Sequence, residues 1–110
     1  MNIETIKEKV RHDLYEISFH AETERYAEDI TILDLETAID NCEILEDYPD
    51  DPRGPSCLIL GYSQSRPIHI VCGSTTTGWI RMITVYIPQP PKWINDKTRR
   101  NQIMGGKINA

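Results

Sequence analysis

Three side chains that can donate, accept or transfer protons lie in two strand-like stretches of the sequence. His69 alternates with apolar residues in the stretch 68–72, and Thr84 and Tyr86 do so in the stretch 79–87. Because successive side chains of a strand point to opposite faces of a sheet, these three can share one face while their apolar neighbours turn to a core. The pattern predicts an acid–base and hydrogen-bonding patch on an open sheet face. For His69 alone, a half-exposed strand histidine without a role is the competing interpretation.

His20 and Arg25 are further candidates for a catalytic or anion-binding role. His20 stands at the start of a short predicted helix, and Arg25 follows it on the same helix. Because five residues rotate by about 140° around a helix, both side chains reach one site only if His20 precedes the first turn. The alternative for Arg25 is a surface ion pair with Glu22 or Glu28.

Apolar periodicity predicts helices in the first half of the chain and strands in the second. A stripe of apolar residues predicts a helix over 3–17, Ser18 is a suitable N-cap for a second helix, and Thr31 with Asp34 resembles the capping box of a third. Strand-like stretches follow at 44–45, 57–62, 68–72 and 79–87. Short, turn-rich connections favour consecutive antiparallel pairing. The order predicts an α+β fold whose N-terminal helices cover one face of a four-stranded antiparallel sheet.

Alternation also sorts the residues of the last strand. Met82 falls on the side of Thr84, whereas Arg81, Ile83 and Val85 fall on the core side. Arg81 is therefore expected to lie on the opposite face from the predicted patch.

The net charge of -5 conceals two halves of opposite sign. Residues 1–51 carry 16 acidic and 4 basic side chains, whereas residues 52–110 carry 1 acidic and 8 basic side chains. A basic half points to RNA or another anionic partner, with the acidic half screening it. The alternative is that the two halves neutralise each other on packing.

Length and composition set further bounds. A chain of 110 residues is expected to form one domain, over residues 1–95, followed by a basic, flexible tail over 96–110. No stretch has the roughly 20 apolar residues of a membrane span, so we expect a cytoplasmic protein without membrane contact. The three cysteines lack the close spacing of zinc or redox sites, which predicts buried free thiols and no metal site.

Several short motifs follow one another across residues 15–95. They are Phe19-His20-Ala21, Arg25, Ile30-Thr31, Ala38-Ile39, Glu43-Ile44-Leu45-Glu46-Asp47-Tyr48, His69-Ile70-Val71, Ile83-Thr84-Val85-Tyr86, Pro88 and Trp93. Their order and spacing resemble the bacterial and archaeal family known as domain of unknown function 4258. Two features depart from that pattern: the acidic net charge, and Cys42 where a small turn residue is expected.

That family is similar to small toxin ribonucleases, which include the RelE-like and MqsR-like messenger-RNA interferases. The resemblance implies a RelE- or barnase-like order of helices and sheet, and an RNA cut that needs neither metal nor cofactor. It also implies inhibition by a small antitoxin protein, often of the zinc-finger type. The polar residues carried over by position are His20, Arg25, His69 and Thr84, with Tyr86 beside them.

RNA cleavage of this kind requires a base for the 2′-hydroxyl, an acid for the leaving 5′-oxygen and a cation for the phosphorane. We expect His69 and His20 to be the acid–base pair and Thr84 and Tyr86 to position the substrate. The phosphate clamp is expected to be Arg25 or, as the weaker candidate on the opposite face, Arg81. The basic tail supplies two further RNA ligands, Arg99 and Arg100.

Two other functions fit the same residues. A non-catalytic RNA- or protein-binding module would use the basic half to bind an anionic partner, and the histidines would have no role in it. A small metal protein would combine His20, His69 and a cysteine, although the sequence has no closely spaced ligand pair.

Overall fold

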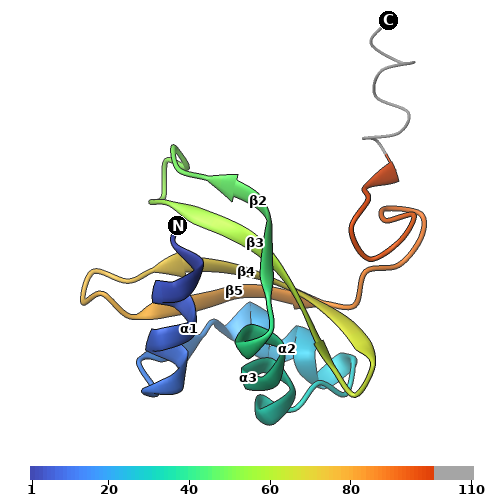
Figure 1. Cartoon of the computed structure of the whole chain (residues 1–110), viewed down its shortest axis with the longest axis horizontal. Helices are drawn as coiled ribbons and strands as arrows, with labels where there is room; N and C mark the ends of the chain where they lie inside the picture. Colours follow the sequence, from blue (N-terminus) through green and yellow to red (C-terminus); the bar gives the residue numbers. More distant parts are fainter. Residues whose placement is uncertain (101–110) are drawn as a thin grey trace, which may run out of the picture.

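The computed structural model describes residues 1–100 and consists of three helices and five strands (Figure 1). In chain order the elements are α1 (Ile3–Arg11), β1 (Tyr15–Ile17), α2 (Phe19–Ala27), α3 (Ile32–Asp40), β2 (Glu43–Tyr48), β3 (Ser56–Ser63), β4 (Arg66–Ser74) and β5 (Ile80–Tyr86). The expected α+β class is confirmed. The part of the predicted flexible tail beyond Arg100 lies outside the described residues.

The sheet has five strands in the order β1-β5-β4-β3-β2. Strand β1 runs parallel to β5, and all the other neighbours are antiparallel. The prediction of four antiparallel strands was therefore wrong, because residues 15–17 form an edge strand instead of continuing the first helix.

The first helix ends early at a left-handed residue. Asp13 has φ 59°, and the Leu14 N–H donates to the Lys9 carbonyl at 2.9 Å, which is the arrangement of a Schellman C-cap. The chain then turns into β1, where Tyr15 is the partner of Ile80 in β5. Pairing with the sheet thus decides the conformation of a stretch whose periodicity also fits a helix.

The predicted caps of the other two helices are confirmed. The Ser18 hydroxyl accepts from the Ala21 N–H at 3.0 Å and begins α2. Thr31 and Asp34 form a reciprocal capping box at the start of α3. These caps fix where α2 begins, and therefore where His20 stands.

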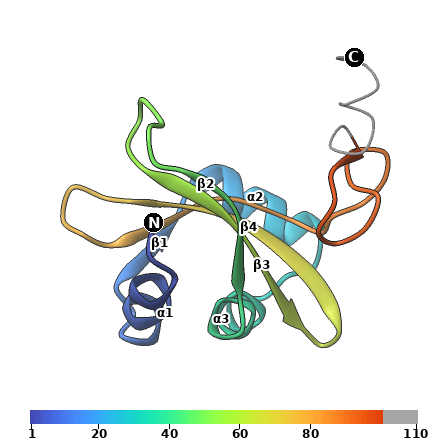
Figure 2. The same cartoon turned by 45° about the horizontal axis from the view of Figure 1, so that its top comes forward.

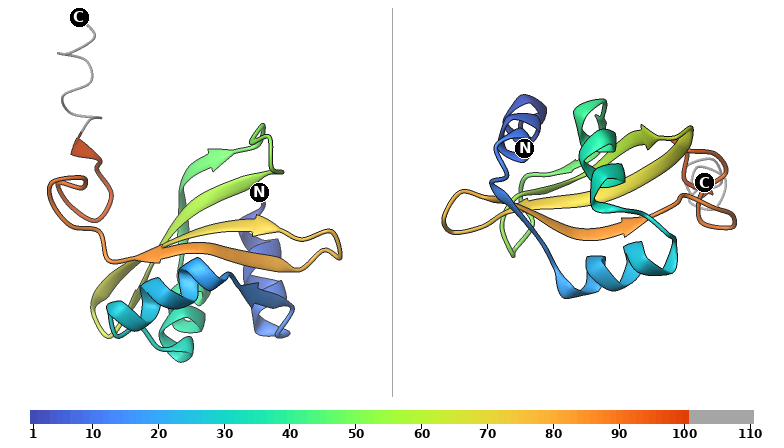
Figure 3. Two further views of the ribbon diagram at one scale, coloured as in Figure 1. Left: turned by 180° about the vertical axis from the view of Figure 1, so that it is seen from behind. Right: turned by 90° about the horizontal axis from the view of Figure 1, so that it is seen from below.

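The helices cover the face of the sheet that we call the inner face (Figure 3). It consists of the alternate apolar residues of β3, β4 and β5, which join the buried residues of the helices in one hydrophobic core: Ile59, Ile68, Ile70, Met82 and Val85. Helix α3 packs closely on β3 at Gly61, where a Cβ atom would lie 1.9 Å from the Ala38 carbonyl oxygen. Helix α2 runs beside β5, and its Ser18 hydroxyl donates to the Ile83 carbonyl at 2.9 Å.

The opposite, outer face carries the predicted polar residues. Strand register pairs His69 with Tyr86 and Val71 with Thr84, so the predicted shared face of His69, Thr84 and Tyr86 is confirmed. A β-bulge at Ile83 then interrupts the alternation, because Val71 pairs with Thr84 whereas Cys72 pairs with Met82.

Because of the bulge, three side chains face the opposite way from the one predicted. Met82 is buried in the core rather than beside Thr84. Arg81 pairs with Gly73, and the Ile83 side chain lies only 3.0 Å from where a Cβ of Gly73 would be, so Arg81 and Ile83 both belong to the outer face. The predicted separation of Arg81 from Thr84 was therefore wrong.

Residues 88–100, which we call the C-terminal segment, lie on the other side of the sheet from the helices (Figures 2 and 3). The segment folds back on itself, with a bridge between Trp93 and Arg99. The Asn95 side chain supports this turn by accepting from the backbone N–H groups of Lys97 and Thr98. No helix within residues 1–100 is both long and apolar enough to cross a membrane.

Candidate functional site

An open groove of about 670 Å³ lies on the outer face, between the start of α2, the β2–β3 loop and the adjoining parts of β4 and β5. The residues of chemical interest that line it are Ser18, His20, Arg53, Ser56, Arg81 and Thr84. The bulge at Ile83 turns Arg81 toward this groove, and the Ser18 cap places His20 in the first turn of α2 beside it. Three residues predicted from the sequence, His20, Arg81 and Thr84, are thus brought together.

Cations predominate among the charged residues of the groove. Arg81 is exposed and has no salt-bridge or side-chain hydrogen-bond partner among residues 1–100. Arg53 is also exposed, although it pairs with Asp51, the one acidic residue of the groove lining. The His20 ring is largely exposed, and its Nε2 lies 3.3 Å from the Glu24 carboxylate. The groove therefore offers an accessible guanidinium and an accessible imidazole in a protein whose net charge is negative.

The neighbouring part of the outer face is closed. His69 is 0% exposed, because Trp93 of the C-terminal segment packs edge-on against its ring with centroids 4.4 Å apart. The Asp96 carbonyl, 2.7 Å away, can only accept, so the His69 Nε2 carries the proton. The other nitrogen, Nδ1, then accepts from the Tyr86 hydroxyl at 3.1 Å. In this conformation both nitrogens of His69 are engaged, and neither can reach a substrate.

Electrostatics agree with a neutral His69. Burial lowers the pKa of His69, and the hydrogen bond to the Asp96 carbonyl opposes that shift only in part. Burial also raises the pKa of Tyr86, an effect that the neighbouring Trp93 indole partly offsets. A neutral ring with both nitrogens satisfied is a structural histidine in this arrangement.

Ion pairs hold the C-terminal segment on the sheet. Arg99 donates from Nε and Nη2 to the two Glu46 oxygens of β2, at 2.6 and 2.8 Å, and its guanidinium also lies over the Trp93 ring. Lys97 pairs with Glu43 at 2.9 Å, and the Tyr62 hydroxyl donates to the Asp96 carboxylate. The hydrogen bond from Arg99 lowers the pKa of Glu46. Arg99, predicted as an RNA ligand, is therefore engaged within the protein, whereas Arg100 is exposed.

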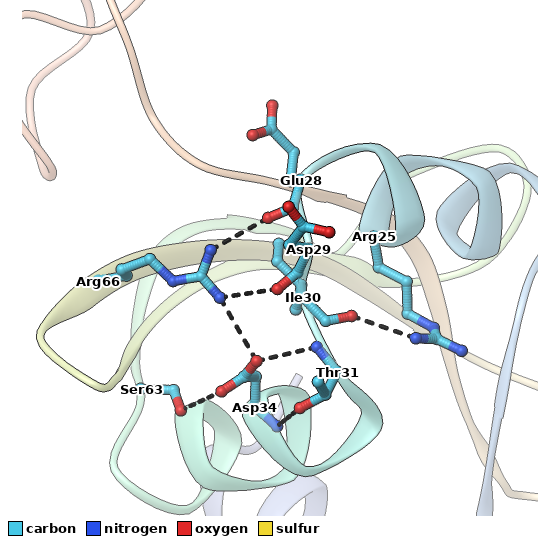
Figure 4. Close-up of polar contacts among 8 residues, drawn as sticks. All are labelled: Arg25, Glu28, Asp29, Ile30, Thr31, Asp34, Ser63 and Arg66. Atoms are coloured by element: carbon cyan, nitrogen blue, oxygen red, sulfur yellow. Dashed lines mark hydrogen bonds and ion pairs between the residues drawn. The ribbon is translucent and has the colours of Figure 1, made fainter.

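Arg25 lies in the last turn of α2 and does not line the groove. Figure 4 shows its contact with Ile30. The Arg25 Nε donates to Glu22 at 2.9 Å and its Nη1 donates to the Ile30 carbonyl at 3.1 Å, so the predicted alternative of an ion pair with Glu22 is present. The same figure shows Arg66 donating to the carbonyls of Glu28 and Asp29, beside the buried Asp34. These contacts join the α2–α3 connection to the β3–β4 hairpin and do not bring Arg25 to His20.

Sequence reasoning missed the residues that close the His69 side. Asp96 is the only acidic residue of the basic half, and Glu46 lies within a strand. Both positions are unusual enough in the sequence to indicate that these residues have specific partners. Arg53 was also missed, because nothing in the sequence indicates that the β2–β3 loop folds over the groove.

The three cysteines are free and buried, as predicted. Burial raises the pKa of Cys42 and of Cys57 to about 11, which makes both poor nucleophiles at neutral pH. Within residues 1–100, no three His, Cys, Asp or Glu side chains lie close enough together to hold a metal ion.

Fold and site together define a small α+β domain with a basic groove on the sheet face opposite its helices. Residues 17–87, more than half of the chain, match the family described as domain of unknown function (DUF4258). The chain belongs to this family, as the order of its motifs suggested. Comparisons with curated proteins and with solved structures gave no match.

Proposed function

We propose that this chain is a cytoplasmic endoribonuclease of the toxin type, which binds the sugar–phosphate backbone of RNA in the open groove. The observation that carries the proposal is the meeting of His20, Arg81 and Thr84 on an accessible surface. An arginine without an internal partner suits a phosphate, because its planar fork matches two phosphate oxygens. Thr84 can position the ribose or phosphate through its hydroxyl.

His20 is the proposed acid–base group. The reaction transfers the 2′-hydroxyl proton to a base, forms a bond from that oxygen to phosphorus, and returns a proton to the departing 5′-oxygen. His20 is the one imidazole on the groove in the conformation described for residues 1–100, and Glu24 is placed to orient it. Arg81 stabilises the charge that develops on the phosphorane oxygens. In this scheme Arg81 takes the clamp role that the sequence pattern assigned first to Arg25.

Cleavage of a labelled single-stranded RNA by the purified protein tests this assignment. General acid–base groups contribute about 10²–10⁴-fold, so His20→Ala should lose cleavage by about this factor. Arg81→Ala should weaken both cleavage and binding. His12→Ala and Arg11→Ala are matched controls, because both residues are exposed at the C-terminal end of α1 and do not line the groove. Cleavage by His20→Ala at the rate of the parent would refute the catalytic role.

A non-catalytic RNA-binding module is the second candidate. It is favoured by the full engagement of His69 and Arg25, since the expected pair of histidines is not assembled. This function predicts RNA binding that weakens steeply with salt, depends on Arg81 and tolerates His20→Ala, with no cleavage by the parent.

A small antitoxin protein, of the zinc-finger type suggested by the family resemblance, is the proposed protein partner. Co-expression with the product of the neighbouring gene should relieve growth arrest and stop RNA loss. Growth arrest that the neighbouring product leaves unchanged would argue against this partner.

A further inference from the structure

On the outer face of the sheet the groove is open, whereas the part around His69 is closed. We propose that the closed part, formed by Leu60, His69 and Tyr86, is a stacking platform for a base of single-stranded RNA. In the absence of RNA the chain's own Trp93 occupies this platform. The inference rests on the proposed RNA-binding function and adds to it a second subsite, which the C-terminal segment controls.

The platform has the chemistry that unpaired bases require. The His69 and Tyr86 rings are in edge contact, with centroids 5.1 Å apart and an angle of 63° between their planes, and Leu60 is the cross-strand partner of His69. Proteins bind the bases of single-stranded RNA by stacking them on the faces of aromatic side chains. The Trp93 indole, which now covers His69 edge-on at an angle of 88°, is a planar two-ring system similar in size to a purine.

The polar contact at the platform also suits a base. The His69 Nε2–H donates to the Asp96 carbonyl oxygen at 2.7 Å, deep under the segment. A base carbonyl is the same kind of acceptor, so it can replace Asp96 without leaving the buried donor unpaired.

The platform and the groove lie in register along the same strands. The pair formed by His69 and Tyr86 is followed on the outer face by the pair formed by Val71 and Thr84. Two residues along a strand span about 7 Å, a distance that one extended nucleotide bridges. A base on the platform can therefore belong to a strand whose phosphate lies in the groove, near Arg81.

The C-terminal segment lies outside the main core. Trp93 is buried but is not part of the hydrophobic core under the helices. The segment is a cover held on the sheet by Trp93 and by ion pairs, and lifting it frees Lys97 and Arg99 from Glu43 and Glu46.

Two variants test the cover. Trp93→Ala removes the indole, and Arg99→Gln breaks the ion pair with Glu46 while the indole stays. Trp79→Ala is the matched control, because it removes the other tryptophan, which is exposed before β5. Carbethoxylation of His69 by diethyl pyrocarbonate, measured by mass spectrometry, reports opening, with the exposed His12 and His20 as internal references. Affinity is measured by fluorescence anisotropy with oligoadenylate and oligouridylate.

We expect both variants, but not Trp79→Ala, to expose His69 and to bind oligoadenylate about tenfold more tightly. A site that is open in only about one molecule in ten loses that factor in apparent affinity. Bound oligoadenylate should then protect His69 of Trp93→Ala from carbethoxylation. Circular dichroism checks the fold, and if Trp93→Ala is unfolded, Arg99→Gln decides the matter.

The outcomes separate the two proposals. If the parent binds RNA through Arg81 but opening the segment changes neither affinity nor protection of His69, the platform is refuted and the proposed function stands. If His69 opens and no variant binds or cleaves RNA, the proposed function fails, and the platform fails with it.

Discussion

Strand β4 is buried on both faces at residues 69 and 70, but by two different kinds of cover. Ile70 points to the inner face, under helices whose apolar residues form one continuous core. His69 points to the outer face, under an irregular segment held by Trp93 and a few ion pairs. Both side chains are 0% exposed, so burial alone does not distinguish the two covers.

The two covers differ in what the domain loses when each of them is removed. A helix satisfies its own backbone and contributes an entire apolar stripe, so removing it exposes the core and unfolds the domain. The C-terminal segment contributes one large apolar side chain and several charged contacts, so the sheet and helices can survive without it. Local opening of such a region is expected at a lower free energy than global unfolding. The inner cover makes the fold, and the outer cover is suited to regulating access.

The largest expected effect comes from disturbing the inner cover. In Gly61→Ala the new Cβ would lie 1.9 Å from the Ala38 carbonyl oxygen, so α3 must move. We expect a loss of about 3 kcal/mol or more in the free energy of unfolding, measured by urea denaturation. Gly73→Ala is the matched change on the outer face, where the Cβ would lie 3.0 Å from the flexible end of Ile83 and in ordinary contact with the Pro55 carbonyl oxygen at 3.8 Å. Equal losses for the two variants would contradict the distinction between the covers.

Removal of the outer cover should lower the free energy of unfolding by less than Gly61→Ala does. Trp93→Ala deletes a buried tryptophan, a change that typically costs about 3–5 kcal/mol in a core. Because Trp93 packs on only one side of the sheet and outside the main core, we expect about 2–3 kcal/mol in urea denaturation. Hydrogen exchange should quicken in the C-terminal segment and remain slow in α3 and β3. Faster exchange throughout the domain would mean that the segment is part of the fold's core.

The ion pair of the outer cover should contribute less again. Arg99 and Glu46 are both partly shielded from solvent, and hydrogen bonds to charged groups contribute about 1.5–3 kcal/mol before screening by water is considered. With that discount we expect Arg99→Gln to lower the free energy of unfolding by about 1–2 kcal/mol. Arg81→Gln, in the open groove, should change stability by no more than about 0.5 kcal/mol. A double-mutant cycle with Glu46→Gln measures the coupling directly, and a coupling near zero would refute the role of the pair.

The sequence predicted the inner cover well because regular periodicity encodes it. Alternation in β4 separated His69 from Ile70 correctly, and the side chains of Ser18, Thr31 and Asp34 marked the true starts of two helices. Each of these signals is local, and each reflects a backbone geometry that the neighbouring residues enforce. The two-faced sheet with helices on one side followed directly.

The wrong predictions share one origin. Where the local sequence fits more than one conformation, tertiary contacts decide which one forms. Asp13 adopts the left-handed conformation that glycine usually supplies, so nothing in its residue type announced the end of α1. The bulge at Ile83 has no glycine to mark it, yet it moves Arg81 to the other face. The contact of Trp93 with His69 joins residues far apart in sequence, and no periodic pattern in the sequence predicts it. The open half of the site was therefore assembled partly from the wrong residues, and the closed half was not foreseen.

The smallest expected effect, and the most specific to the outer cover, is a dependence on pH. Burial lowers the pKa of His69 in the folded protein. The unfolded chain then binds a proton more readily than the folded one, so the stabilising contribution is complete above about pH 6.5 and declines as the pH falls below it. The Arg99 hydrogen bond likewise lowers the pKa of Glu46, whose contribution is complete above about pH 4.5 and declines below that value.

Acidification should therefore loosen the C-terminal segment in two stages while the inner core remains intact. The groups that face His69 are Asp96, Arg99, Glu46 and Tyr86, and protonation places its new charge beside Arg99. Fluorescence of Trp93, read in a Trp79→Phe background, should shift toward that of an exposed indole as the pH falls through the first stage. His69→Gln should abolish the first stage and keep the second. A first stage that persists unchanged in His69→Gln would show that His69 does not control the cover.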